Sequence, residues 1–130
     1  MSTRLISPKI WTTYFGNLRN IPKEIVPVSI TRYPPKGWSG LSYQKLSPTV
    51  DLLRDMKSGL IPIEEYVYRY TQDTLGVLTQ DGVIEDLVSL TSGAPEIVLV
   101  CYEKPPQFCH RQIVAAWLGE SCLGELQIKK

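Results

Sequence analysis

Apolar positions along the chain fall into short runs that are separated by proline- and glycine-rich stretches. Four consecutive aliphatic residues occupy 97–100, a pattern typical of a strand buried on both faces of a parallel sheet. This run predicts a strand over 96–102. Two earlier strands are predicted. One spans 9–15, where β-branched and aromatic residues stop at a Gly-Asn turn. The other spans 25–30, and Pro27 indicates that its early residues lie outside the hydrogen-bonded ladder.

Helical spacing of apolar residues appears between and after these strands. Ser47 is suited to be an N-cap and Pro48 to be a first helical residue, so a helix is predicted from there to Gly59. Further helices are predicted from about Pro62, over about 81–90 and over about 109–118. The order predicts one small α/β domain over 1–130, a Rossmann-like layered sandwich whose mostly parallel sheet carries helices on both faces.

An irregular loop follows the second predicted strand, because two prolines and two glycines at 32–40 forbid regular structure. Its aromatic and basic side chains, with Trp38 among the aromatic ones and Arg32 and Lys36 among the basic ones, resemble the mixture that holds a nucleobase or single-stranded nucleic acid. Aromatic residues in a proline-rich loop more often pack that loop onto the domain, so packing is the favoured interpretation and binding is the alternative.

Composition excludes several classes of protein. Fourteen basic and thirteen acidic residues leave a formal charge of +1, so no global field drives binding to nucleic acid or to an anionic membrane. Residues 1–8 lack the apolar core of a signal peptide, and no apolar run has the roughly 20 residues of a membrane span. We therefore expect a cytoplasmic protein with no membrane partner; its oligomeric state is not determined by these features.

Two of the three cysteines and the single histidine lie in the tract 101–111, between the last predicted strand and the last predicted helix. In open α/β sheets, ligands bind at the carboxyl ends of strands, so this junction is the predicted functional site. Cys101 and Cys109 are poor disulfide partners if one ends a strand and the other begins a helix, and no structural disulfide is expected. Packing is the expected role of Cys122.

The tract also carries a family resemblance. Cys-Tyr-Glu-Lys-Pro followed by Phe-Cys-His-Arg, together with the Leu-Ser-Pro to Tyr stretch at 46–70, resembles bacterial and phage proteins of domain-of-unknown-function family 488. The segments 14–17, which ends at Asn17, and 34–38 extend this similarity over nearly the whole chain. The resemblance implies a compact Rossmann-like α/β fold and locates the site, and it implies no substrate, cofactor or reaction.

Several reactive side chains are candidates at the site. Cys109 at a helix start, near Arg111, would ionise readily, and His110 is the only imidazole for proton transfer. Neighbours on a helix diverge by about 100°, so Cys101 competes with Cys109 as the partner of His110. Glu103 would accept from His110 or Arg111 or act as a general base.

An anion site is the further candidate chemistry. Arg111 and the first amides of the helix would hold a phosphate or carboxylate, and Arg32 and Lys36 would converge on the same anion. Asn17 and Trp38 complete the predicted ligand-binding residues.

Some familiar sites are absent from the sequence. Neither a phosphatase-type Cys-x5-Arg loop, nor a P-loop, nor a Gly-x-Gly-x-x-Gly fingerprint occurs. The cysteines lack paired Cys-x2-Cys spacing, so no metal and no other cofactor is predicted.

Two functions follow from these observations. One is an enzyme that binds an anionic small molecule or a nucleotide at 101–111, with Cys101 or Cys109 as nucleophile. The other is a non-catalytic module that binds a protein or nucleic-acid partner, with the Cys/His/Arg cluster in a structural role.

Overall fold

The computed structural model describes residues 7–104 and 107–126 of the chain. A five-stranded sheet forms its centre, with strand order β3-β2-β4-β1-β5 and parallel pairing throughout. The strands are β1 (Lys9–Tyr14), β2 (Val26–Ser29), β3 (Leu41–Ser42), β4 (Glu96–Cys101) and β5 (Cys122–Glu125). The α-helices are α1 (Val50–Lys57), α2 (Ile63–Asp73), α3 (Gln80–Leu90) and α4 (His110–Leu118). Short 3-10 helices complete the described chain: η1 (Phe15–Asn20), η2 (Gln44–Leu46), η3 (Leu75–Val77) and η4 (Gly119–Ser121).

The aliphatic strand β4 lies between β2 and β1 and is covered on both faces. Residues 97–101 are all fully buried, as the unbroken aliphatic run predicts. Successive side chains on a strand alternate between faces, so Ile97 and Leu99 pack on one side of the sheet and Val98 and Val100 on the other.

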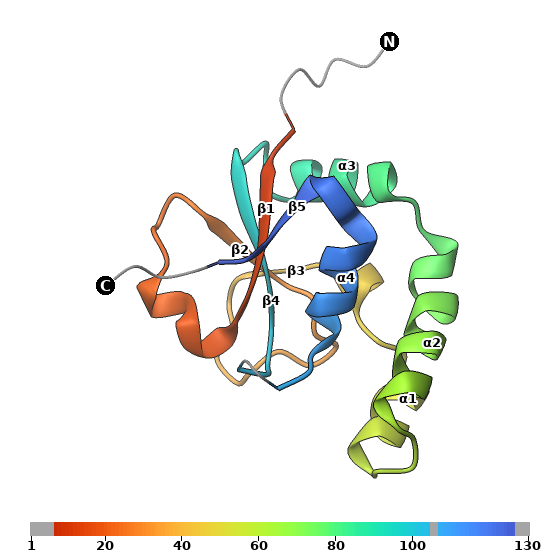
Figure 1. Cartoon of the computed structure of the whole chain (residues 1–130). Helices are drawn as coiled ribbons and strands as arrows, with labels where there is room; N and C mark the ends of the chain where they lie inside the picture. Colours follow the sequence, from red (N-terminus) through yellow and green to blue (C-terminus); the bar gives the residue numbers. More distant parts are fainter. Residues whose placement is uncertain (1–6, 105–106, 127–130) are drawn as a thin grey trace.

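The two faces carry different layers (Figure 1). The four α-helices pack over the face of Ile97 and Leu99, where the larger apolar cluster lies. The opposite face is smaller and is covered by η1, through Phe15 and Leu18, and by Leu126. Both faces therefore bear helical segments, but the α-helices are confined to one of them.

Two strands were absent from the sequence prediction. Leu41–Ser42 pairs with β2 at the edge, and Cys122–Glu125 pairs with β1 after the last helix. Cys122 is thus an edge-strand residue, and its partly buried side chain packs against the larger apolar cluster. The helix cap also differs, because Thr49 and not Ser47 is the N-cap of α1 and accepts from the backbone N–H of Leu52 at 3.1 Å.

The carboxyl ends of the parallel strands meet at one edge of the sheet. The loop after β2 and the segment after β4 leave from neighbouring strands at this edge, where paired residues such as Ser29 and Val100 are 71 positions apart in the chain. In the described part of the chain, no helix has the length and apolar character needed to cross a membrane.

Candidate functional site

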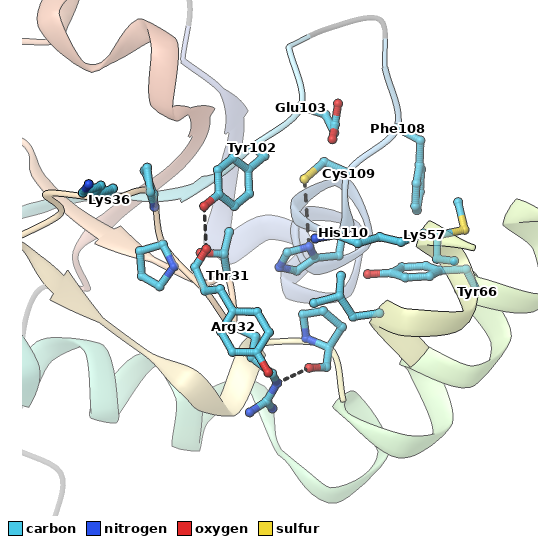
Figure 2. A pocket seen from close by; sticks show the side chains of 16 residues that line it. Thr31, Arg32, Lys36, Lys57, Tyr66, Tyr102, Glu103, Phe108, Cys109 and His110 are labelled. Carbon is cyan, nitrogen blue, oxygen red and sulfur yellow. Dashed lines mark hydrogen bonds between the residues drawn. The ribbon is translucent and has the colours of Figure 1, made fainter. Parts of the chain in front are cut away.

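A cavity of about 400 Å³ opens at the carboxyl edge of the sheet, and its size suits a small organic ligand. Figure 2 shows its walls coming from the loop after β2, the segment after β4, the start of α4, and helices α1 and α2. The lining residues are Thr31, Arg32, Tyr33, Pro34, Pro35, Lys36, Pro48, Leu53, Met56, Lys57, Tyr66, Tyr102, Glu103, Phe108, Cys109 and His110.

Charge in the cavity wall is predominantly positive. Arg32, Lys36 and Lys57 contribute three positive charges against one negative charge from Glu103, a formal balance of +2. Arg32 is anchored, since its Nε donates to the carbonyl of Pro48 at 2.7 Å. An anionic group is therefore favoured over a cationic one.

Aromatic rings line the side of the cavity formed by α2. Tyr66 packs edge-on against Phe108, with ring centroids 5.6 Å apart, and stacks on Tyr70 at 6.2 Å. The Tyr70 hydroxyl donates to the carbonyl of Leu46 at 2.6 Å, which fixes this stack to the core. A planar ligand would find π faces and apolar edges here.

Cys109 is the N-cap of α4, and this position decides its geometry. Its backbone is extended, with φ −146° and ψ 152°, so the helical divergence expected between neighbouring side chains does not apply. Its Sγ lies 3.9 Å from Nδ1 of His110, and Figure 2 shows the two side chains facing each other. The expectation that adjacency makes this pair geometrically awkward is therefore wrong.

His110 has a defined tautomer. Its Nε2 lies 2.7 Å from the carbonyl oxygen of Ile30, which only accepts, so Nε2 carries the proton and donates. In the neutral ring Nδ1 is then unprotonated and directs its lone pair toward the sulfur of Cys109. Burial of the ring lowers the pKa of His110 to about 4, and the positive charge of Arg111 acts in the same direction.

Cys101 and Cys109 are joined in a disulfide, which corrects the sequence-based expectation. The prediction placed the two residues on separate elements and took that as evidence against pairing. The N-cap of α4 lies beside the end of β4, and the Cα atoms of the two cysteines are 6.9 Å apart. Cys122 is the free cysteine of the described chain, and burial raises its thiol pKa.

Arg111 has a different role from the one predicted. It is fully buried and forms a two-bond ion pair with Glu125 of β5, through Nε at 3.0 Å and Nη2 at 3.1 Å. Its Nη1 donates to Sγ of Cys101 at 3.4 Å, and Tyr14 packs over the guanidinium at 5.9 Å. Glu125 already accepts from two nitrogens of the Arg111 guanidinium, and Arg111 does not line the cavity. The predicted anion site on Arg111 is therefore wrong.

The other predicted residues divide into two groups. Glu103, Arg32 and Lys36 line the cavity. Glu103 is exposed, and the predicted bonds from His110 and Arg111 go instead to Ile30 and Glu125.

Two predicted ligand residues lie outside the cavity. Asn17 is buried and donates to the hydroxyl of Thr13 at 3.1 Å. Trp38 packs edge-on against Phe15 with centroids 5.3 Å apart, as in the loop-packing interpretation of these aromatic residues. Both residues stabilise the fold around η1.

One group of side chains carries donor atoms that suit a metal. The two sulfurs of Cys101 and Cys109 and a ring nitrogen of His110 lie within 4.8 Å of one another and are buried. While the sulfurs are bonded to each other, neither is an anionic ligand, so this state offers a metal little more than the imidazole.

Several contributors escaped the sequence prediction. Lys57, Tyr66 and Phe108 line the cavity, yet their spacing marks them as helix or loop residues only. The partner of His110 is a backbone carbonyl, which no side-chain motif reveals. Glu125 lies on a strand that was not predicted, so the partner of Arg111 was hidden with it.

Comparisons with known proteins agree with the extent of the resemblance. The family model of DUF488-N3a, described as the active DUF488-N3 subclade, matches residues 11–122. No curated protein and no solved structure matches the chain. The matched range contains the cavity residues and the tract 101–111, but it ends before Glu125.

Proposed function

The chain belongs to the DUF488 family, and we propose that this domain is an enzyme that binds an anionic, ring-containing small molecule of the nucleotide class and attacks it with the sulfur of Cys109. The observation that carries the proposal is the contact of Cys109 Sγ with the unprotonated Nδ1 of His110, 3.9 Å apart at the wall of the cavity. Nucleophile and base in this arrangement are the usual components of covalent catalysis.

The side chains in the cavity wall indicate the chemical class of the ligand. The basic side chains of Arg32, Lys36 and Lys57 favour a phosphate or carboxylate, and the rings of Tyr66 and Phe108 favour a planar group. A nucleotide combines both features, and the volume of about 400 Å³ suits one nucleotide rather than a polymer.

Proton transfer can be followed atom by atom once the disulfide is reduced. The Cys109 thiol gives its proton to Nδ1 of His110, while Nε2 keeps its hydrogen bond to Ile30. A thiolate opposite the ring favours the imidazolium and raises the pKa of His110 from its value in the disulfide state. The sulfur bonds to the electrophilic atom, and the leaving group departs with its electron pair and takes the proton back from Nδ1.

The backbone amide of Gln112 provides a second source of thiolate stabilisation. Its N–H donates to the backbone carbonyl of Cys109 at 3.0 Å and lies beside the Cys109 side chain in a capping box, so the positive end of the α4 dipole is close to the sulfur. Glu103 is exposed at the cavity and would exchange protons with a bound ligand.

We expect the reduced protein to be alkylated at Cys109 about tenfold faster, near neutral pH, than the same cysteine in the urea-unfolded chain, because an ionised thiol is the reactive form. Replacing His110 with Gln should remove most of this advantage. The rate is measured with iodoacetamide, and the labelled cysteine is identified by peptide mass spectrometry in a Cys122→Ser background.

The unfolded chain is the internal reference for this experiment, because it has the same cysteines without the site. Equal rates for Cys109 in the folded and unfolded chains would contradict an activated nucleophile. Circular dichroism of the His110→Gln protein shows whether a slower rate comes from chemistry or from unfolding.

A second prediction concerns the charge of the ligand. Iodoacetate and iodoacetamide differ in charge but carry the same leaving group, so their rate ratio at Cys109 reports the local potential. We expect the ratio of the iodoacetate rate to the iodoacetamide rate at Cys109 to be higher in the folded protein than in the unfolded chain. A Lys36→Gln/Lys57→Gln double variant should lower this ratio by about threefold or more, because it removes two nearby positive charges. The matched control is Lys23→Gln, an exposed lysine away from the cavity.

A non-catalytic binding module is the second candidate, and the exposed rim favours it. Tyr33 and Tyr102 are 58% and 47% exposed beside the cavity, joined by a hydrogen bond from the Tyr102 hydroxyl to the Tyr33 carbonyl. Exposed aromatic residues of this kind are common at binding surfaces. A Cys109→Ser protein that retained full biological effect would favour this candidate over the enzyme.

A further inference from the structure

The two bonded sulfurs differ in their access to the cavity. Cys109 lines the cavity wall, whereas Cys101 is fully buried behind it at the end of β4 and does not line the cavity. A ligand therefore reaches the sulfur of Cys109 first. The nucleophilic role proposed above gives Cys101 no task, although its sulfur is bonded to the nucleophile.

Each sulfur also has its own ionising neighbour. Cys109 faces the imidazole of His110, while Cys101 accepts a hydrogen bond from Nη1 of Arg111 at 3.4 Å. The guanidinium is fixed in place by its two bonds to Glu125, at 3.0 and 3.1 Å, so one donor remains directed at Cys101. A cation beside a buried thiol favours the ionised form, so Arg111 would increase the fraction of Cys101 that is present as the attacking thiolate.

We propose that Cys109 and Cys101 are the attacking and resolving thiols of a thiol–disulfide exchange reaction with a small anionic disulfide bound in the cavity. The Cys109 thiolate attacks one sulfur of the disulfide RSSR, the S–S bond breaks, and RS⁻ leaves, which makes a mixed disulfide on Cys109. The Cys101 thiolate then attacks Sγ of Cys109, the mixed disulfide breaks, and a second RS⁻ leaves. In sum, RSSR is reduced to two RSH, the two cysteines are oxidised to the observed disulfide, and their two protons go to the two leaving thiolates.

The substrate class rests on the proposed function, because the preference for an anion comes from the same basic side chains of the cavity, Arg32, Lys36 and Lys57. The order of attack does not rest on it. That order follows from the burial of Cys101 and the exposure of Cys109 to the cavity.

The experiment uses 5,5′-dithiobis(2-nitrobenzoate), an aromatic disulfide with two carboxylates, on the reduced Cys122→Ser protein. Two equivalents of thionitrobenzoate should be released per chain, and the product should have the mass of the chain less two hydrogens, with no adduct. A Cys101→Ser variant should release one equivalent and keep a stable adduct on Cys109. A Cys109→Ser variant should react slowly, since Cys101 is fully buried.

The outcomes separate the two proposals. A stable adduct on the protein that has both cysteines would overturn the resolving role of Cys101 and leave Cys109 as a nucleophile. Failure of Cys109 to react in the Cys101→Ser variant would instead contradict the proposed function. The mass of the product in the two-cysteine protein needs no variant at either position, so it decides the inference even if Cys101→Ser does not fold.

Arg111 is tested by the ratio of two rates in one sample. The first release reports attack by Cys109, and the second reports attack by Cys101, which alone contacts Arg111. An Arg111→Met/Glu125→Leu double variant should slow the second release relative to the first by about tenfold, the effect of a cation on thiolate formation. An unchanged ratio would remove Arg111 from the reaction. Stoichiometric zinc in the reduced protein, with thiols that react only after chelation, would overturn the exchange reaction itself.

Discussion

Replacement of Glu125 with Ala is expected to lower the free energy of unfolding by about 3 to 5 kcal/mol, the usual cost of breaking a buried ion pair from one side. Arg111 is fully buried, and the carboxylate of Glu125 is the acceptor for both its Nε and its Nη2. Without Glu125 the guanidinium would keep its charge inside the protein and lose two strong hydrogen bonds. Urea denaturation of the wild-type and variant proteins measures the difference.

Two variants show whether the loss comes from the unpaired charge. Glu120→Ala removes an exposed glutamate five residues earlier and should change stability by less than about 0.5 kcal/mol. Arg111→Met/Glu125→Leu removes both charges and should recover most of the lost stability, because apolar residues of similar size replace a buried pair at little cost. A loss below about 1 kcal/mol for Glu125→Ala would show that water reaches the guanidinium.

The sequence predicts the central part of the fold because burial leaves a plain pattern there. The aliphatic run at 97–100 identifies the central strand of the sheet, and the strand and helix boundaries around it are correct to within a few residues. The edge strands β3 and β5 leave no such pattern. β3 has two residues, and β5 contains a glycine and a half-exposed Leu123, so neither alternates clearly between apolar and polar positions.

The missed strand β5 explains one error at the site, and the misplaced start of α4 explains another. Arg111 was predicted to bind an anion because its partner, Glu125, lies on β5. The contact between Cys109 and His110 was doubted because the helix was predicted from about Cys109, whereas α4 begins at His110 and Cys109 is its extended N-cap. A shift of one residue at a helix start changes the direction of a side chain, and sequence patterns do not place helix ends that closely.

Lowering the pH from about 7 to about 5 is expected to cost the oxidised protein about 2 kcal/mol of stability through His110 alone. Burial lowers the pKa of His110 to about 4 in the folded protein, whereas an unfolded histidine titrates near 6.5. Below about pH 6.5 the unfolded chain therefore takes up a proton that the folded chain does not, and stability falls as the pH drops through this window. Urea denaturation near the two pH values measures the loss.

A His110→Gln protein should show almost no stability change between these two pH values, because the glutamine amide can donate toward Ile30 but does not titrate. Its stability near pH 7 should be lower by about 1 to 2 kcal/mol, since it fills the buried site less well than the ring. The hydrogen bonds from Arg69 to Asp55 and from Tyr43 to Asp86 lower the pKa of each aspartate, so their contribution is lost only as the pH falls below the unfolded value of 3.8. The change in the free energy of unfolding between about pH 7 and about pH 5 therefore reports His110 and not these aspartates. If the His110→Gln protein lost as much stability over this interval as the wild-type protein, that result would contradict a buried neutral imidazole beside Cys109.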